Sequence, residues 1–135
     1  MREILFRGKT AKDKEWVYGD LLNVGVDYDY AIRIYGGREH GQVNAVNEKT
    51  IGQFTGLTDK NGKKIFEGDI CLVCRETVTM QGITEQHNGA FGLRYKSGEF
   101  NSLLYLNRSR PEGRWFDTLE VIGNIHDNPE LLKEA

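Results

Sequence analysis

Residues 50–74 read TIGQFTGLTDKNGKKIFEGDICLVC, and this stretch decides the fold. Apolar and polar residues alternate on both sides of a polar run, TDKNG, as they do in half-buried strands that flank a turn. Asp59, Asn61 and Gly62 suit a turn that needs a positive φ near its end. The stretch therefore predicts a strand, a turn and a second strand at the centre of one β-rich domain.

Strands are also expected on both sides of this centre. Residues 3–8 alternate, with Ile4 and Phe6 on one face, and EWVYGDLL at 15–22 is expected to pair with them. Gly19 and Asp20 within that second segment are interpreted as a turn or a bulge. Further strands are expected at 28–35, 90–95, 102–107 and 119–126.

The C-terminal segment changes its pattern after the last expected strand. Asn128 is a residue type that caps helices, Pro129 follows at the first helical position, and Glu130 lies in the first turn. The segment therefore predicts a helix of about two turns, which is too short to form without docking on the sheet. Leu131 and Leu132 are expected to make that contact.

Length and composition fit this arrangement. The chain has 135 residues with 16 glycines and two prolines. A chain of this length can bury a sufficient core by itself, and frequent glycine is typical of many tight turns between short strands. We expect an all-β (mainly β) fold, a small antiparallel β domain with a short C-terminal helix, forming a single domain over residues 1–135.

Charge and cysteine content limit the class of protein. The net charge is −2, so the whole molecule lacks the positive field that favours general binding to phosphate backbones. The apolar runs are only a few residues long, far short of a membrane span, and the N-terminus has no apolar signal-peptide core. Two cysteines give no disulfide framework. We expect a cytoplasmic protein with no membrane partner.

Cys71 and Cys74 form a C-x-x-C motif. Redox pairs of this kind lie at helix N-termini, whereas ICLVC is an apolar, strand-like run. A zinc site would need further ligands, and the three histidines, at 40, 87 and 126, are scattered. Residues three apart on a strand point to opposite faces. The motif is therefore interpreted as two free structural thiols, with no metal bound.

Two groups of acidic residues were considered as further sites. Asp59 and Asn61 occupy the first and third positions of a calcium-type loop, but Lys64 stands where that loop requires glycine. Turn chemistry explains the same residues. Asp27 and Asp29 resemble a carboxylate pair, yet on a strand they project from one face and are expected to be solvated.

The sequence contains no catalytic motif. We find no serine in a strand-to-helix elbow, no cysteine beside an activating base, no dinucleotide fingerprint and no P-loop. We therefore expect a protein that is not an enzyme, with no catalytic residues, no cofactor and no small-molecule substrate.

One basic segment contains aromatic residues. RSRPEGRWF, at 108–116, holds Arg108, Arg110, Arg114 and Trp115, followed by Phe116. Such a composition can contact a nucleic-acid strand or a partner protein. The alternative explanation is a solvated loop beside a core tryptophan.

Three blocks of the chain resemble the YopX family of small proteins encoded by phages and prophages. They are REILFRG at 2–8, TIGQFTGLTDKNGKKIFEGDI at 50–70 and LEVIGNIHDNPELL at 119–132. They stand in the family's order and reach both ends, so the resemblance implies that the whole domain is of this family. It implies a β-rich fold with SH3-like barrel character and no catalytic residues to carry over. Cys71 and Cys74 lie outside the family pattern.

These observations lead to three hypotheses about function. The first is a phage or prophage protein of the bacterial host cell that is a non-enzymatic binding or oligomeric accessory protein, with self-association or a protein partner at its strand edges. The alternative is a nucleic-acid-binding β-barrel module that uses the 108–116 cluster. The second alternative is an enzyme with an unrecognised site.

Overall fold

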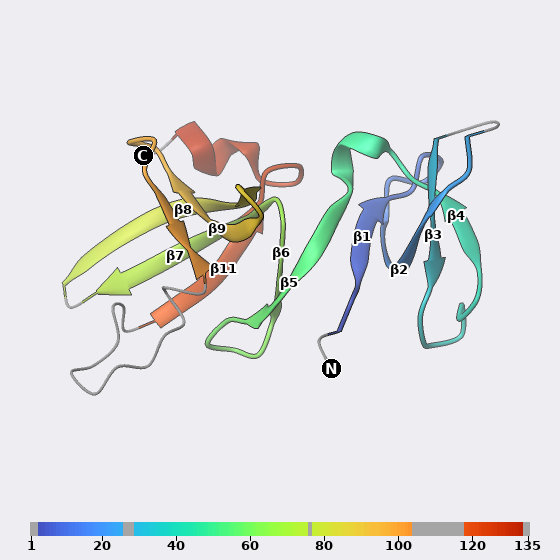
Figure 1. The fold of residues 1–135 in the computed structure, drawn as a ribbon, viewed down its shortest axis with the longest axis horizontal. Helices are drawn as coiled ribbons and strands as arrows, with labels where there is room; N and C mark the ends of the chain where they lie inside the picture. The colour runs from blue at the N-terminus through green and yellow to red at the C-terminus, as the bar shows by residue number, and fades with distance from the viewer. Residues whose placement is uncertain (1–2, 26–28, 76, 104–117, 134–135) are drawn as a thin grey trace. The chain divides into compact units, whose positions relative to one another are not determined.

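The structure, a computed structural model, describes residues 3–25, 29–75, 77–103 and 118–133 (Figure 1). The prediction of a mainly β, antiparallel chain is confirmed, because the described strands form two antiparallel sheets. In the described ranges these sheets do not close into a barrel, and no described helix has the length and apolarity needed to cross a bilayer. The chain divides into two compact units, unit 1 (Met1–Gly56) and unit 2 (Leu57–Ala135).

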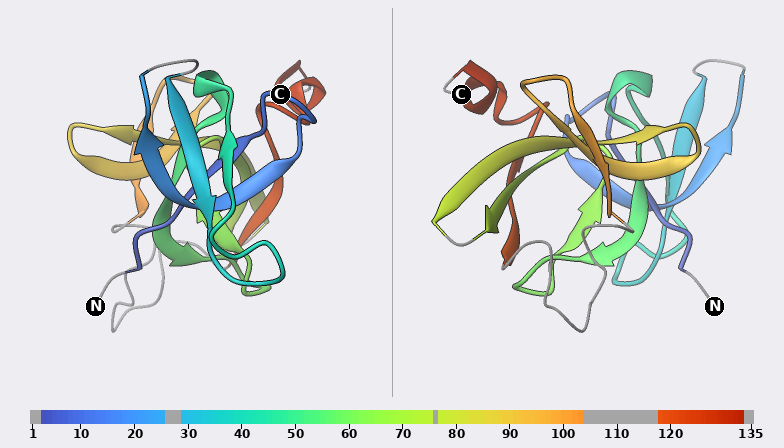
Figure 2. Two further views of the ribbon diagram at one scale, coloured as in Figure 1. Left: turned by 90° about the vertical axis from the view of Figure 1, so that its right-hand side faces the viewer. Right: turned by 60° about the vertical axis from the view of Figure 1, so that its left-hand side comes forward.

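Unit 1 consists of short strands and one 3-10 helix. In chain order these are β1 (Phe6–Lys9), β2 (Trp16–Asn23), β3 (Tyr30–Ile34), β4 (Val43–Ala45), η1 (Glu48–Thr50) and β5 (Gly52–Thr58). Its strands are ordered β4-β3-β2-β1-β5, and Figure 2 (left) shows β2 and β3 side by side. An isolated bridge between Thr10 and Val46 joins the residues that follow β1 and β4.

Close packing of the backbone explains two glycines of unit 1. A Cβ on Gly8 would lie 3.1 Å from Cβ of Val46, in the core beside the fully buried Ile32. A Cβ on Gly19 would overlap the carbonyl oxygen of Arg33 on β3. Gly19 and Asp20 therefore lie inside β2, and the prediction of a turn or bulge there is wrong.

The first strand is confirmed, as is its antiparallel pairing with the second. The side chains of its N-terminal end differ from a simple apolar face. Ile4 is 68% exposed, whereas Leu5 and Arg7 are buried. The guanidinium of the buried Arg7 lies over the ring of Trp16, with Cζ 4.6 Å from the ring centroid.

Unit 2 contains the second sheet. Its elements are β6 (Lys64–Phe66), β7 (Asp69–Arg75), β8 (Val78–His87), β9 (Ala90–Tyr95), β10 (Phe100–Ser102), β11 (Thr118–Asn124) and η2 (Pro129–Lys133). The sheet order is β10-β9-β8-β7-β11, and β6 pairs with the end of β5. Figure 2 (right) shows the twisted ribbon of β7 and β8. The core cluster is formed by Ile65, Cys71, Val73, Leu93, Tyr95, Leu103 and Leu119.

The central stretch forms strands as predicted, but with a second turn. The first turn lies between β5 and β6, and Gly62 has the expected positive φ of 81°. The second lies at Glu67 and Gly68, where Gly68 has φ of 92° and the Asp69 carboxylate accepts the backbone N–H of Phe66 at 2.7 Å. The single strand expected from Lys64 onward is thus divided into β6 and β7, because this turn directs the chain into the other sheet.

The β8–β9 hairpin follows its turn residues. Asn88 and Gly89 both have positive φ, at 51° and 82°, which matches the two-residue turn that fits strand twist. The strand expected at 90–95 is confirmed as β9. The strand expected at 102–107 overlaps β10 only at Ser102, where β10 ends, Leu103 is outside the strand, and residues 104–107 lie outside the described residues.

The C-terminal helix begins where the sequence predicts, at Pro129, but it is a 3-10 helix and not an α-helix. A capping Asn128 side chain would accept an N–H group of the helix that follows it. Instead it accepts the N–H of Asn124, which precedes it, at 3.2 Å, so the prediction that Asn128 caps the helix is wrong. Of the two residues predicted to dock it, Leu131 is half-buried and its carbonyl accepts from the Gln81 side chain on β8 at 2.8 Å, while Leu132 is exposed.

Candidate functional site

The two cysteines lie on β7, so the predicted strand is confirmed at this motif. Both are free thiols. Cys71 is fully buried in the core of unit 2, 3.6 Å from the Thr84 hydroxyl, and Cys74 is half-buried. Burial raises the pKa of Cys71 to about 12, so this thiol is protonated at neutral pH and is a poor nucleophile.

Asp59 is buried, and backbone N–H groups surround its carboxylate. Oδ1 accepts the N–H of Asn61 and of Lys63, and Oδ2 accepts the N–H of Val121, each at 2.9 Å. Burial by itself would raise the pKa of Asp59, but these three hydrogen bonds, with the nearby charge of Lys63, outweigh it and lower the pKa. Turn chemistry and docking on β11 thus account for the residues that resemble a calcium loop.

A second contact fixes the same region. The Lys60 N–H donates to the Leu119 carbonyl, and the Ile125 N–H donates to the Gly68 carbonyl, both at 2.9 Å. Residues of the central sequence block are therefore hydrogen-bonded to the C-terminal block within unit 2. The residues of these two sequence blocks therefore position one another. The hydrogen bond between Asp59 and Val121 spans 62 residues, so no local sequence pattern predicts it.

The other predicted site residues are not brought together by the described structure. Asp29 is exposed, while Asp27 lies outside the described residues. Arg108, Arg110, Arg114 and Trp115 also lie outside them, so the 108–116 cluster stays a prediction. In the described part of the chain, no three acidic, histidine or cysteine side chains are placed to hold a metal ion.

One face of the unit 1 sheet carries exposed aromatic side chains, which the sequence did not single out. Strand register puts Arg7 opposite Tyr18, and the Tyr35 N–H donates to the Tyr18 carbonyl at 3.2 Å, so the two tyrosines are cross-strand neighbours. Tyr18 is 42% exposed and Tyr35 is 59% exposed. We call this surface the tyrosine face, and it comprises Lys9, Trp16, Tyr18, Asp20, Arg33, Tyr35 and Val43.

Basic side chains outnumber acidic ones on the described strands of this face. Lys9 Nζ lies 5.6 Å from the centroid of the Trp16 ring, on which Arg7 also stacks. Arg33 pairs with Asp20 at 3.6 Å, and both side chains are exposed. Arg7 is buried, and Arg33 is the partner of the one acid on these strands, Asp20. Tyr35 directly follows β3, and the pairing of β2 with β3 is what places it beside Tyr18.

Comparison with known proteins identifies a family and a similar solved structure. The family model described as "YopX protein" matches residues 5–133. The crystal structure of protein EF1440 from Enterococcus faecalis is similar, with a TM-score of 0.58 and 26% sequence identity, over 98% of this chain and 99% of that one. Among the curated proteins, none matches this chain.

Proposed function

Because the chain belongs to the YopX family, we propose that it is a phage- or prophage-encoded, non-enzymatic binding or oligomeric accessory protein of the bacterial cytoplasm. The family match over residues 5–133 confirms the family predicted from the three sequence blocks. The observation that carries the binding role is the tyrosine face of unit 1.

Interfaces are enriched in Tyr, Trp and Arg, and a few such side chains supply most of the binding energy. On the tyrosine face, Tyr18 on β2, Tyr35 directly after β3 and Val43 on β4 are all exposed. Rigid rings held by a sheet lose little conformational freedom when a partner binds. The surface therefore has the chemistry of an interface.

A non-enzymatic role is supported by the way the buried acids are used. Asp59 accepts backbone donors on both oxygens, and Asp69 accepts the N–H of Phe66. These carboxylates stabilise turns, so neither has the exposed position of a general acid or base.

The tyrosine face is better supported as a binding surface than the strand edges. β4 has three residues, and the Ala11 N–H donates to the Ala45 carbonyl. On the edge strand β11, the Leu119 carbonyl accepts from Lys60. Short and covered edges do not add a partner strand readily.

SH3-like barrel character of unit 1 is part of the proposal, supported by the bridge between Thr10 and Val46.

Light scattering on the full chain tests this proposal. We expect a mass above that of one chain at high concentration, and a return to one chain in Tyr35→Ala. Val78→Ala is the control, because Val78 in unit 2 is as exposed as Tyr35, at 59%. A strictly monomeric profile at every concentration would remove the oligomeric part of the proposal.

Nucleic-acid binding by the 108–116 cluster stays a second candidate, because three arginines and two aromatic residues lie close together in that segment of the sequence. An enzyme with an unrecognised site stays the remaining alternative, and the described residues supply no observation in its favour.

A further inference from the structure

We propose that Asn88, in the turn between β8 and β9, is a site of spontaneous deamidation, at which the side-chain amide is converted into a carboxylate without an enzyme. The chain has a second asparagine–glycine pair, Asn61-Gly62, whose surroundings protect it from the same reaction. The inference lies beyond the proposed function and does not depend on it.

The reaction closes a ring between an asparagine side chain and the next backbone nitrogen. At Asn88 the nitrogen of Gly89 loses its proton and attacks Cγ, so a new C–N bond forms. The bond from Cγ to the side-chain nitrogen breaks, and that nitrogen leaves as ammonia with the proton that Gly89 lost. Water then opens the cyclic imide at one of its two carbonyls, which yields aspartate or isoaspartate. No oxidant or reductant takes part.

Both asparagine–glycine pairs have the residue types and the exposure that this reaction needs. All four residues are exposed to solvent. A Cβ atom at either glycine would meet no atom within 4 Å, so water and base can reach both pairs. Exposure therefore does not distinguish the two pairs, but their hydrogen bonds do.

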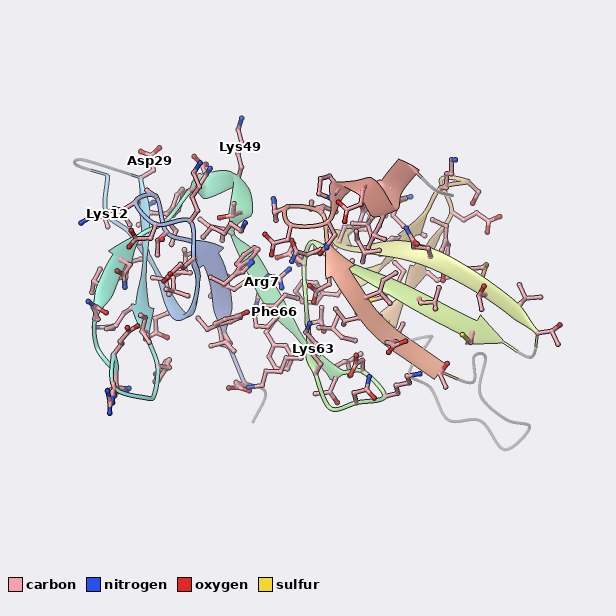
Figure 3. All side chains as sticks on the ribbon, turned by 180° about the vertical axis from the view of Figure 1, so that it is seen from behind. Arg7, Lys12, Asp29, Lys49, Lys63 and Phe66 are labelled. Carbon is pink, nitrogen blue, oxygen red and sulfur yellow. The ribbon has the colours of Figure 1, made fainter. Side chains whose placement is uncertain are left out.

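Hydrogen bonds hold the reacting groups of Asn61-Gly62, in the turn between β5 and β6 that also carries Lys63 (Figure 3). The Gly62 N–H donates to the Asp59 carbonyl at 3.0 Å. The Asn61 side-chain nitrogen, which would be the leaving group, donates to Glu120 Oε2 at 3.4 Å. The Asp59 carboxylate also accepts the N–H groups on both sides of Gly62, so it opposes the negative charge that the attacking nitrogen would acquire.

The same groups of Asn88-Gly89 are not held in this way. Within the described part of the chain, neither the Asn88 side chain nor the Gly89 N–H has a hydrogen-bond partner. The flanking residues His87 and Ala90 form the last pair of the hairpin, so the strand pairing does not use the N–H of the turn glycine. The attacking nitrogen therefore has no hydrogen bond to break before it reacts.

The tip of the hairpin can change its shape, which ring closure requires. β7 pairs with β8 as far as Ile83, and β10 pairs with β9 from Gly92 onward, so the tip beyond them is a ribbon of two strands. Such a ribbon is only marginally stable in water. The His87 ring contacts Phe100 with ring centroids 5.2 Å apart, and this contact fixes the base of the tip one residue before Asn88.

The products differ from the original chain in charge and in backbone length. The new carboxylate makes the net charge of −2 one unit more negative. Isoaspartate also adds a carbon to the main chain of the two-residue loop, which then no longer matches the turn that pairs His87 with Ala90.

Peptide mapping of the full chain tests the inference. The chain is incubated at mildly alkaline pH and digested with chymotrypsin, and mass spectrometry follows the acid form of each peptide with time. We expect Asn88 to react about tenfold faster than Asn61, because the Gly62 N–H must first leave its hydrogen bond. In urea, which removes these hydrogen bonds, the two rates should converge.

Two variants separate the sites. Asp59→Ala should raise the rate at Asn61 and leave the rate at Asn88 unchanged, because it removes a carboxylate from the first turn alone. Asn88→Gly has no amide and keeps a glycine pair that suits the turn, so isoelectric focusing should no longer show the acidic form that the unaltered chain acquires. A circular dichroism spectrum identical to that of the unaltered chain shows that each variant is folded.

Three outcomes would overturn the inference. One is an equal rate at the two pairs in the native chain, and another is a faster rate at Asn61. The third is a native chain that has no acid form at Asn88 after a time in which the chain in urea has reacted there.

Discussion

At Asp59 a single carboxylate accepts three backbone hydrogen bonds and joins two segments that are 62 residues apart. Burying a charge is costly unless it is hydrogen-bonded, and each hydrogen bond to a charged group contributes about 1.5–3 kcal/mol. The lowered pKa of Asp59 shows that the hydrogen bonds outweigh burial. The carboxylate therefore stabilises the fold in its ionised form.

Replacing Asp59 by Ala should lower the free energy of unfolding by about 3 kcal/mol, because the N–H groups of Val121, Lys63 and Asn61 lose their acceptor. Chemical denaturation at neutral pH measures this. Asp29→Ala, at an exposed acid of the same type, should change stability by less than about 0.5 kcal/mol. Equal losses of unfolding free energy in the two variants would show that the Asp59 carboxylate does not stabilise the turn.

Acid should remove the same contribution. The pKa of Asp59 is lower in the folded chain than its ordinary value of 3.8, so the folded state binds fewer protons near that pH. The stabilisation is present above about pH 4 and is lost as the pH falls through the folded-state pKa. The stability difference between the unaltered chain and Asp59→Asn should shrink over that range, and a difference that grows toward acid would contradict the pKa.

The thiols should differ in reactivity. Because the pKa of Cys71 is raised to about 12 by burial, a disulfide reagent at neutral pH should label it only after unfolding. In the native chain the labelled thiol should be Cys74, so Cys74→Ser should abolish native labelling and Cys71→Ser should preserve it. Rapid native labelling of Cys71 would contradict its place in the core.

At the scale of elements, turn chemistry was the part of the fold that the sequence predicted best. Gly62 carries its conformational requirement in its own residue type, so its turn was predicted at the correct position. Gly19 was wrongly predicted to lie in a turn or bulge. A glycine is needed there because β3 packs closely against it, and the alternation of residues along one strand does not show which strand lies beside it. The three-residue β4 was missed because it is too short for a periodic pattern.

The connection from β11 to η2 should be sensitive to a single methyl group. A Cβ on Gly123 would lie 2.6 Å from the Asn128 side-chain oxygen, which accepts from the Asn124 N–H. Gly123→Ala should therefore destabilise the chain by about 1–3 kcal/mol. Adding Asn128→Ala should remove the two shortest contacts and leave the Cβ atom of residue 128 at 3.1 Å, so Gly123→Ala should cost less stability in the Asn128→Ala background than in the unaltered chain in urea denaturation. Additive losses would show that the two residues do not interact.

For the whole molecule, the sequence predicts one domain, and the structure divides the chain into two compact units. β5 begins in unit 1, where Gly52 pairs with Arg7, and its last residues pair with β6 of unit 2. The candidate site could not be predicted from the sequence either, because it too depends on how strands pair. The tyrosine face depends on the register between β2 and β3, whereas the predicted 108–116 cluster was visible only because its residues are contiguous.

Because one strand serves both units, we expect the chain to unfold in one cooperative step. Scanning calorimetry should show a single transition whose calorimetric and van't Hoff enthalpies agree. Two resolved transitions would show that the units unfold independently and would overturn the single-domain prediction.

The contact between Asp59 and Val121 also sets an order of events during synthesis. Every strand of unit 1 is complete by Thr58, so its sheet can form while the remaining chain is still being made. The N–H donors of Val121 and Ile125, which bond to Asp59 and Gly68, are made only after the strands β6 to β10. If translation stops before Val121, the strands of unit 1 can still form their sheet, but the Asp59 carboxylate lacks the hydrogen bond from the Val121 N–H.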